Sequence, residues 1–149
     1  MHPQRQLRGT LIVAVLAVLL IPGLLFAGQK SADQVNWVSY KKGMAEAQKA
    51  GKPVFIHFFT DWCQYCKEMQ AKTFSNPKVA GYLNQNFVAI RVNTDTEGII
   101  ATQYEVRPIP DNVFLTPEGK RLRHVLGFYD ADNFMNVLRH VQVSLAEAK

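Results

Sequence analysis

Cysteine is scarce in this chain, which has only two in 149 residues, Cys63 and Cys66. A structural zinc site needs about four ligands, and the sequence has neither a second cysteine pair nor a histidine pair at ligand spacing. A c-type haem site needs histidine directly after the second cysteine, where this chain has Lys67. A disulfide between such near neighbours closes too small a loop to stabilise a fold much. These exclusions leave thiol–disulfide redox chemistry as the favoured interpretation of the pair.

Runs of positive charge, low-complexity segments and internal repeats are also missing from the sequence. The net charge of +5 includes Arg5 and Arg8 near the N-terminus, and the other basic residues are scattered along the chain. A nucleic-acid surface needs such residues gathered into a run or a patch. We therefore expect no nucleic-acid partner.

The N-terminal segment combines Arg5 and Arg8 with an uncharged stretch from Thr10 to Ala27, mostly Leu, Val, Ile and Ala. A basic start followed by an apolar run is typical of a secretory signal, and this run is just long enough to span a bilayer. We expect residues 1–28 to be a signal peptide or a membrane anchor and residues 29–149 to be one domain. Both alternatives place the domain outside the cytoplasm, and the dithiol favours a Gram-negative periplasm.

The two cysteines lie where a strand is expected to give way to a helix. The apolar run Val54–Phe59 predicts a buried strand, and good helix formers follow Cys66 up to Lys72. Cys63 then lies at the helix N-terminus, where unpaired N–H groups and the helix dipole favour a thiolate. Cys66 lies one turn further and can attack a mixed disulfide on Cys63. The pattern predicts Cys63 as nucleophile and Cys66 as resolving thiol.

The rest of the chain predicts an α/β domain with a central mixed β-sheet of about four strands, flanked by helices. Apolar patterns and turn signals predict strands over residues 54–59, 87–93, 111–115 and 120–126, and helices over 39–50, 63–72, 97–104, from 77 onward and from 130 onward. The last two strands are joined by Thr116-Pro117-Glu118-Gly119, a strong turn signal, and therefore form an antiparallel hairpin.

Five short segments, taken in order, resemble the thioredoxin superfamily over residues 35–145. They are Gly51-Lys52-Pro53, Asp61-Trp62-Cys63 with Cys66-Lys67, Val92-Asn93-Thr94-Asp95, Arg107-Pro108-Ile109-Pro110 and Pro117-Glu118-Gly119-Lys120. Within the superfamily, the sequence is most similar to periplasmic thioredoxin-like domains such as the C-terminal domain of the reductant carrier DsbD. The resemblance implies a thioredoxin fold, with no cofactor beyond the redox-active Cys63–Cys66 disulfide and no metal.

The resemblance also assigns roles around the dithiol. It implies that the Ile109–Pro110 bond is cis and lies against the two cysteines, in keeping with the near-confinement of cis bonds to X–Pro pairs. Backbone groups next to Pro110 would then pair with the chain of a partner protein. Trp62, Tyr65 and Ile109 are expected to contact that partner.

Three positions depart from the family pattern. Where thioredoxins usually carry a buried Asp six residues before the first cysteine, this chain has His57, and Arg91 replaces the usual Lys on the neighbouring strand. Burial and the nearby charge would keep His57 neutral and able to accept the Cys66 proton; alternatively, His57 is a core histidine without a role in exchange. Asp111 stands after Pro110 where Thr is usual, and its charge is expected to select partners.

The sequence therefore predicts an extracytoplasmic thiol–disulfide oxidoreductase that acts on protein disulfides. A reductant is favoured because Ile109 before the proline resembles thioredoxins, and it would need a membrane electron donor of the DsbD type. An oxidase or isomerase is the alternative within this class. Two alternatives from other classes stay open. One is a copper-handling chaperone that uses Cys63, Cys66 and His57. The other is a binding module that holds partners at Pro110 without turnover.

Overall fold

The computed structural model describes residues 34–147. The expected signal peptide or anchor at residues 1–28 lies outside this range. Within residues 34–147 no helix is both long and apolar enough to cross a membrane.

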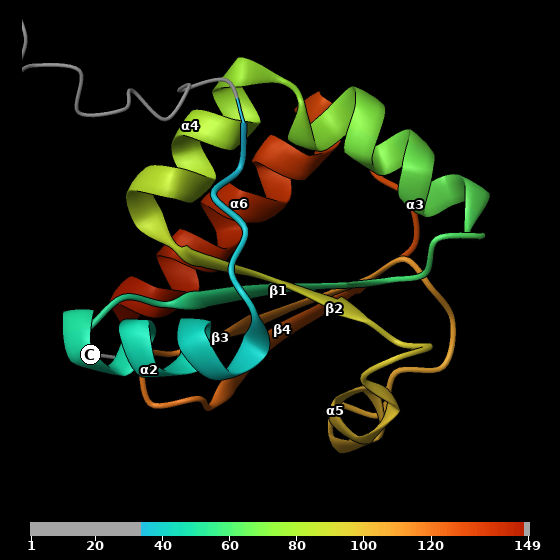
Figure 1. Cartoon of the computed structure of the whole chain (residues 1–149). Coiled ribbons are helices and arrows are strands. Elements are labelled where there is room, and N and C mark those ends of the chain that lie inside the picture. Colours follow the sequence, from blue (N-terminus) through green and yellow to red (C-terminus); the bar gives the residue numbers. More distant parts are fainter. Residues whose placement is uncertain (1–33, 148–149) are drawn as a thin grey trace, which may run out of the picture. The chain divides into compact units, whose positions relative to one another are not determined.

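Four strands form one mixed sheet in the order β2-β1-β3-β4 (Figure 1). They are β1 (Val54–Phe59), β2 (Val88–Asn93), β3 (Asp111–Leu115) and β4 (Arg121–Leu126). Strands β1 and β2 are parallel, whereas β3 is antiparallel to both of its neighbours, β1 and β4. The predicted mixed sheet and its closing hairpin are thereby confirmed.

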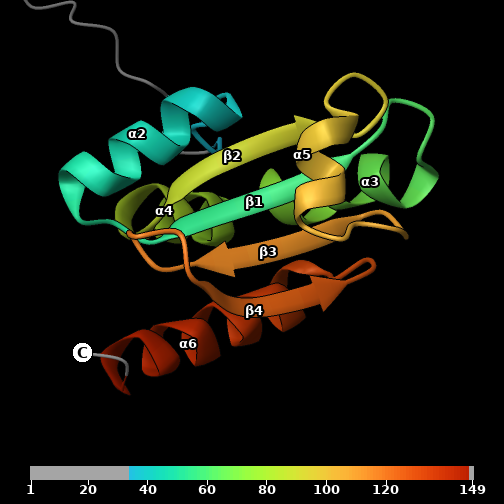
Figure 2. The same cartoon turned by 90° about the horizontal axis from the view of Figure 1, so that it is seen from below.

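Helices cover both faces of this sheet, as Figures 1 and 2 show from two sides. They are α2 (Tyr40–Ala50), α3 (Gln64–Met69), η1 (Gln70–Phe74), α4 (Pro77–Asn86), α5 (Gly98–Gln103) and α6 (Ala131–Glu147). Buried side chains of α3, η1, α4 and α6 pack in one cluster with Phe55 of β1. Those of α2 and α5 pack in a second cluster with Val54, Ile56 and Phe58, on the opposite face.

Strand β1 is central, and its side chains are buried on both faces. Residues Val54 to Phe58 are all fully buried, as a near-continuous apolar run predicts for an inner strand. Because successive side chains of a strand point to opposite faces, His57 shares the face of Phe55. That is the face covered by α3, so the strand delivers His57 beneath the helix that carries Cys66.

The predicted helix over residues 63–72 is present, but its type changes after Met69. The α-helix ends at Met69 and continues as the π-helical segment η1. This segment buries Phe74, whose ring centroid lies 5.9 Å from that of Phe55 and 5.6 Å from that of Phe134 in α6. Aromatic pairs of this kind contribute roughly 0.5–1.5 kcal/mol each beyond their burial. Packing of Phe74 thus holds the end of the dithiol helix against the sheet.

Capping residues set the ends of the other helices. Gly51 ends α2 with φ of 62°, a left-handed conformation that favours glycine. Asn76 caps α4 by accepting from the N–H of Lys78 at 3.0 Å. Asp130 caps α6, as predicted, by accepting from the N–H of Asn133 at 2.9 Å. Ser39 occupies the N-cap position of α2, but its side chain accepts no capping hydrogen bond from the described residues.

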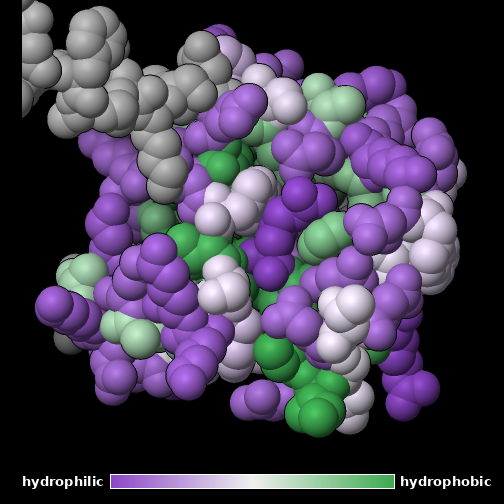
Figure 3. Space-filling model, viewed as in Figure 1, coloured by the Kyte–Doolittle hydropathy of each residue, from purple (hydrophilic) through white to green (hydrophobic). Residues whose placement is uncertain are grey.

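The visible surface of the domain is mainly polar, with hydrophobic atoms gathered over α5 in the space-filling view (Figure 3). Ile99 of this short helix is 88% exposed. The other large exposed apolar side chains among the described residues include Trp62 and Tyr65, which flank the cysteines. Apolar exposure is thus concentrated in a few side chains rather than spread along one helix face.

Close packing of α2 against β2 gives a test of the fold. A methyl group on Gly43 would lie 2.6 Å from Cδ1 of Ile90 and 2.9 Å from Cγ2 of Val38. We expect Gly43→Ala to lower the free energy of unfolding by about 1–2 kcal/mol, because overpacking outweighs the gain in helix propensity. Gly81→Ala in α4 is the matched control: a methyl there meets no atom within 4 Å and should stabilise slightly. Urea unfolding measures the free energy of unfolding of both variants. An equal change in the two would contradict the close packing of Gly43 against Ile90 and Val38.

Candidate active site

The dithiol occupies the junction of β1 and α3. Cys63 is the N-cap residue of α3, and its Sγ accepts a hydrogen bond from the backbone N–H of Cys66 at 3.2 Å. The two cysteines form a disulfide, with their Cα atoms 5.3 Å apart. The predicted place of Cys63 at a helix start is confirmed. An N–H donor aimed at Sγ stabilises negative charge on that sulfur when the disulfide is reduced.

Two exposed aromatic side chains flank the cysteines, although the sulfur-bearing residues themselves are buried. Trp62 is 69% exposed and Tyr65 is 63% exposed, against 5% for Cys63 and 2% for Cys66. The indole Nε1–H of Trp62 donates to Asp95 Oδ2 at 2.9 Å, so the loop after β2 fixes the position of the ring. Of the two cysteines, Cys63 is the more exposed.

Pro110 lies at the same end of the sheet as the dithiol. Its peptide bond with Ile109 is cis, and Pro110 is buried while Ile109 is partly exposed. The register pairs Asp111 with Phe58, which places the start of β3 beside the end of β1, from which the chain leads into Cys63. The Pro110 carbonyl accepts from the N–H of Gly127 at 2.8 Å, which ties this segment to the end of β4.

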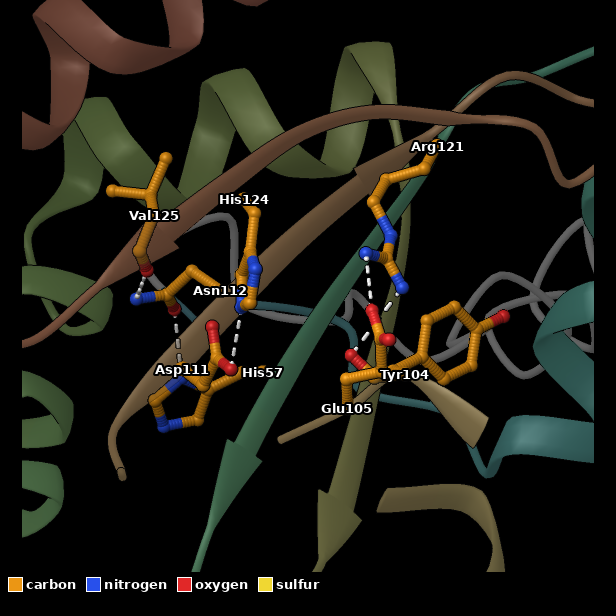
Figure 4. A network of polar contacts seen from close by, with 8 residues as sticks. All are labelled: His57, Tyr104, Glu105, Asp111, Asn112, Arg121, His124 and Val125. Carbon is orange, nitrogen blue, oxygen red and sulfur yellow. Dashed lines mark hydrogen bonds and ion pairs between the residues drawn. The ribbon is translucent and has the colours of Figure 1, made fainter. Parts of the chain in front are cut away.

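His57 is fully enclosed and hydrogen-bonded through one ring nitrogen (Figure 4). Its Nδ1 lies 2.9 Å from Asn112 Oδ1. The Asn112 amide nitrogen donates to the Val125 carbonyl at 3.2 Å and contacts Met69 Sδ at 3.9 Å. The amide oxygen therefore faces His57, and Nδ1–H is the donor. Nε2 is then the basic nitrogen, and it has no hydrogen-bond partner among residues 34–147.

Burial keeps the imidazole neutral. The pKa of His57 is lowered to about 4, chiefly by desolvation, with the charge of Arg91 adding to the effect and the Asn112 hydrogen bond opposing it. Arg91 stands opposite His57 in the pairing of β1 with β2. Its guanidinium lies 4.0 Å from the ring centroid of Phe59 and 5.7 Å from that of Trp37. The expected neutral imidazole beside a guanidinium is thus present.

A cleft of about 210 Å³ opens on Cys66. It is lined by Phe59, Thr60, Asp61, Cys66, Lys67, Gln70, Ala71 and Arg91. His57 is not among these residues, so the structure does not bring it to the cleft wall beside Cys66. Thr60, Asp61 and Gln70 are cleft residues for which the sequence pattern predicts no role. One signal was available for Gln70, because residues four apart lie on the same face of a helix and Gln70 follows Cys66 at that spacing.

The expectation that Asp111 selects partners by its charge is wrong. Its side chain is fully buried, and Oδ2 lies 2.6 Å from Nε2 of His124 in the adjacent strand β4 (Figure 4). Burial, partly offset by His124, raises the pKa of Asp111. The carboxylate is turned into the sheet because the register brings β4 beside β3, so it presents no charge to a partner.

The residues named for copper binding do not form a metal site in this disulfide-bonded structure. Among residues 34–147, no three His, Cys, Asp or Glu side chains gather in a way that could hold a metal ion. His57 in particular directs Nδ1 to Asn112 rather than to a sulfur.

The sequence model of the thioredoxin-like domain matches residues 40–142, most of the described chain. This chain belongs to the thioredoxin-like family. The four-stranded sheet, the Cys63–Cys66 pair and the cis bond before Pro110 are therefore features of a thioredoxin-like domain.

Curated relatives of the chain include thiol:disulfide interchange proteins named DsbD. That of Photorhabdus laumondii is 31% identical over 111 residues, which cover 71% of this chain and 19% of the relative. The DsbD of Yersinia pestis is 32% identical over 108 residues, which cover 69% of this chain and 18% of the relative. The chain thus spans about a fifth of the length of these relatives.

Solved structures give the same result. A thioredoxin from Thermus thermophilus is 29% identical, with a TM-score of 0.69 over 75% of this chain and 90% of that one. The oxidised C-terminal domain of DsbD from Neisseria meningitidis is 27% identical, with a TM-score of 0.59 over 67% of this chain and 90% of that domain. Family and cysteine pair together support a thiol–disulfide oxidoreductase.

Burial of His57 predicts a specific loss of stability in acid. Between about pH 6.5 and pH 4, His57 takes up a proton in the unfolded chain but not in the folded one, so stability falls as the pH falls through this window. The loss attributable to His57 is about 3 kcal/mol. In His57→Gln, the free energy of unfolding measured with urea should fall by about 3 kcal/mol less than in the unmodified protein between these two pH values. His140→Gln, which alters an exposed histidine of α6, is the control; an unchanged pH dependence in His57→Gln would contradict the assignment.

Proposed function

We propose that this protein reduces disulfide bonds in other proteins outside the cytoplasm, with Cys63 as nucleophile and Cys66 as resolving thiol. The observation that carries the proposal is the placement of Cys63 as N-cap of α3, with the Cys66 N–H directed at its sulfur. A sulfur in that position is favoured as a thiolate, the form that attacks disulfides. The thiol of Cys66 stands close enough to complete the exchange.

The reaction runs in two steps. The Cys63 thiolate attacks one sulfur of the substrate disulfide, forming a mixed disulfide and releasing the first substrate thiolate. Cys66 then loses its proton and attacks Cys63 Sγ, which closes the Cys63–Cys66 disulfide and releases the second substrate thiolate. Two electrons pass from the dithiol to the substrate, and the released thiolates take protons from water. The disulfide-bonded form is therefore the product of one turnover.

The substrate chain is proposed to lie between the aromatic pair and the proline segment. Trp62 and Tyr65 expose large apolar surfaces beside the cysteines, and such residues are enriched where proteins bind each other. Ile109 and Pro110 lie at the same end of the sheet, where backbone groups can pair with an extended segment. The buried Asp111 leaves this surface without an added carboxylate.

The proposal also covers the direction of disulfide exchange and the cellular compartment of the protein. Reduction is favoured because Ile109 precedes Pro110 as in thioredoxins, and the chain is similar to a thioredoxin and to part of DsbD. Electrons would then come from a membrane carrier of the DsbD type. Residues 1–28 would place the domain in the periplasm, as a cleaved signal peptide or as an anchor in the inner membrane.

The two cysteines should behave differently on substitution. Cys66→Ala should accumulate mixed disulfides through Cys63, because the second step is lost, whereas Cys63→Ser should form none with protein substrates. Non-reducing gels followed by mass spectrometry after trapping with acid identify the linked cysteine. Mixed disulfides formed through Cys66 in Cys63→Ser, at the level of Cys66→Ala, would reverse the assignment.

The direction of exchange is tested by the equilibrium potential of the Cys63–Cys66 pair against glutathione. A reductant should lie near the value of about −270 mV typical of thioredoxin, and an oxidase near the value of about −120 mV of DsbA. A measured potential at the oxidising end would replace the proposed reductant with the alternative of an oxidase or isomerase.

A further inference from the structure

Three residues that line the cleft beside Cys66 carry buried polar atoms that the fold itself leaves unpaired. Thr60 Oγ1, Gln70 Oε1 and Arg91 Nε are all buried and have no hydrogen-bond partner within residues 34–147. All three residues line the cleft. Thr60 is only 1% exposed. Buried polar groups are nearly always hydrogen-bonded, to ordered water where protein partners are missing.

The cleft has the size and the chemistry to hold such water. Its volume of about 210 Å³ exceeds several times the roughly 30 Å³ share of one water molecule. The Asp61 carboxylate, the Lys67 ammonium and the Arg91 guanidinium belong to residues that line the cleft, and such charged groups are hydrogen-bond partners for water. A chain of water can therefore lead from Cys66 along the cleft wall.

Asp61 supplies a carboxylate on the same wall. Its Oδ2 accepts from Asn93 Nδ2 at 3.3 Å, which fixes the carboxylate at the rim, and its charge acts on the guanidinium of Arg91. Arg91 and Lys67, the cations that line the cleft, balance the charge of the carboxylate. Among the lining residues, Asp61 is the one that carries a carboxylate, a group with oxygens that accept protons.

We propose that ordered water in this cleft carries the proton of the Cys66 thiol to the Asp61 carboxylate. The inference deepens the proposed function, because it concerns the second step of the exchange. As the Cys66 S–H bond breaks, the proton passes through water to an Asp61 oxygen, and the thiolate attacks Cys63 Sγ. The Cys63–substrate bond breaks, the second substrate thiolate leaves, and protonated Asp61 later returns its proton to solvent.

This route differs from the one that the sequence predicts through His57. The imidazole has a basic Nε2, but its residue does not line the cleft, and its Nδ1–H is bonded to Asn112 on the neighbouring strand β3. Asp61 instead shares the cleft with Cys66 directly. The family's carboxylate, absent beneath the helix, is in this proposal replaced by one at the rim.

A two-phase experiment separates the steps. The reduced full-length protein is mixed with one equivalent of 5,5′-dithiobis(2-nitrobenzoic acid) at neutral pH by stopped flow. Attack by Cys63 releases one thionitrobenzoate anion, and attack by Cys66 on Cys63 releases the second. Cys66→Ala, which gives only the first release, assigns the phases. The absence of a first phase dependent on Cys63 would defeat the proposed function itself, independently of Asp61.

Asp61→Asn should slow the second phase about tenfold or more, because general-base assistance is typically worth 10²–10⁴-fold and solvent replaces only part of it. The first phase should change less than about twofold, because Cys63 attack needs no proton acceptor. Asp61→Glu should restore most of the second phase. Thr60→Val keeps the carboxylate but removes an unpaired hydroxyl from a residue that lines the cleft. It should slow the same phase and is the variant to measure if Asp61→Asn folds poorly.

Two controls decide against rival explanations. Glu68→Gln removes a negative charge from α3, close to Cys66 along the chain but outside the cleft, and should leave both phases unchanged. Equal slowing by Glu68→Gln would reduce the effect of Asp61 to general charge and overturn the proposal. An unchanged rate of the second phase in Asp61→Asn would also overturn the proposal. If His57→Gln slowed the second phase and Asp61→Asn did not, the proton acceptor would be His57.

Discussion

The central position of β1 is the constraint on which the rest of the structure depends. The strand is hydrogen-bonded to β2 on one side and to β3 on the other, and residues Val54 to Phe58 are buried on both faces. A strand held in this way has no freedom to slip, because a shift by one residue would move every side chain to the other face. The end of β1 therefore fixes where Cys63 begins α3, and its pairing with β3 fixes where Pro110 lies.

The same arrangement places polar side chains in the interior, at a cost that local pairing reduces. His57 is bonded to Asn112, and Asp111 to His124, so that each of these two buried side chains has one partner. Arg91 compensates its desolvation through the aromatic rings of Phe59 and Trp37. Such groups stabilise a fold less than an apolar core would, and their concentration near the dithiol is what a functional site leads one to expect.

Charge around the resolving thiol is distributed differently from the pattern in which a buried carboxylate lies beneath the helix. Here a neutral imidazole and a guanidinium stand on the two paired strands, and the acid that lines the cleft is Asp61. Without a carboxylate at position 57, the residue beneath the helix opposes a thiolate on Cys66 less strongly. The consequence, under the proposed function, is that proton release and thiolate stabilisation are handled by different residues.

The sequence by itself determined the order of strands and helices, the strand-to-helix junction at Cys63 and membership in the family. These follow from local periodicity, helix formers and short motifs, which need no knowledge of distant contacts. Only the tertiary structure decided that Asp111 faces His124, that Nδ1 of His57 bonds Asn112, and that the dithiol helix turns into η1 to bury Phe74. Each of these depends on register and packing between segments far apart in the chain, and a one-residue change of register would pair different side chains. The cleft shared by Cys66 and Asp61 arises in the same way, because its walls come from β1, β2 and the dithiol helix together.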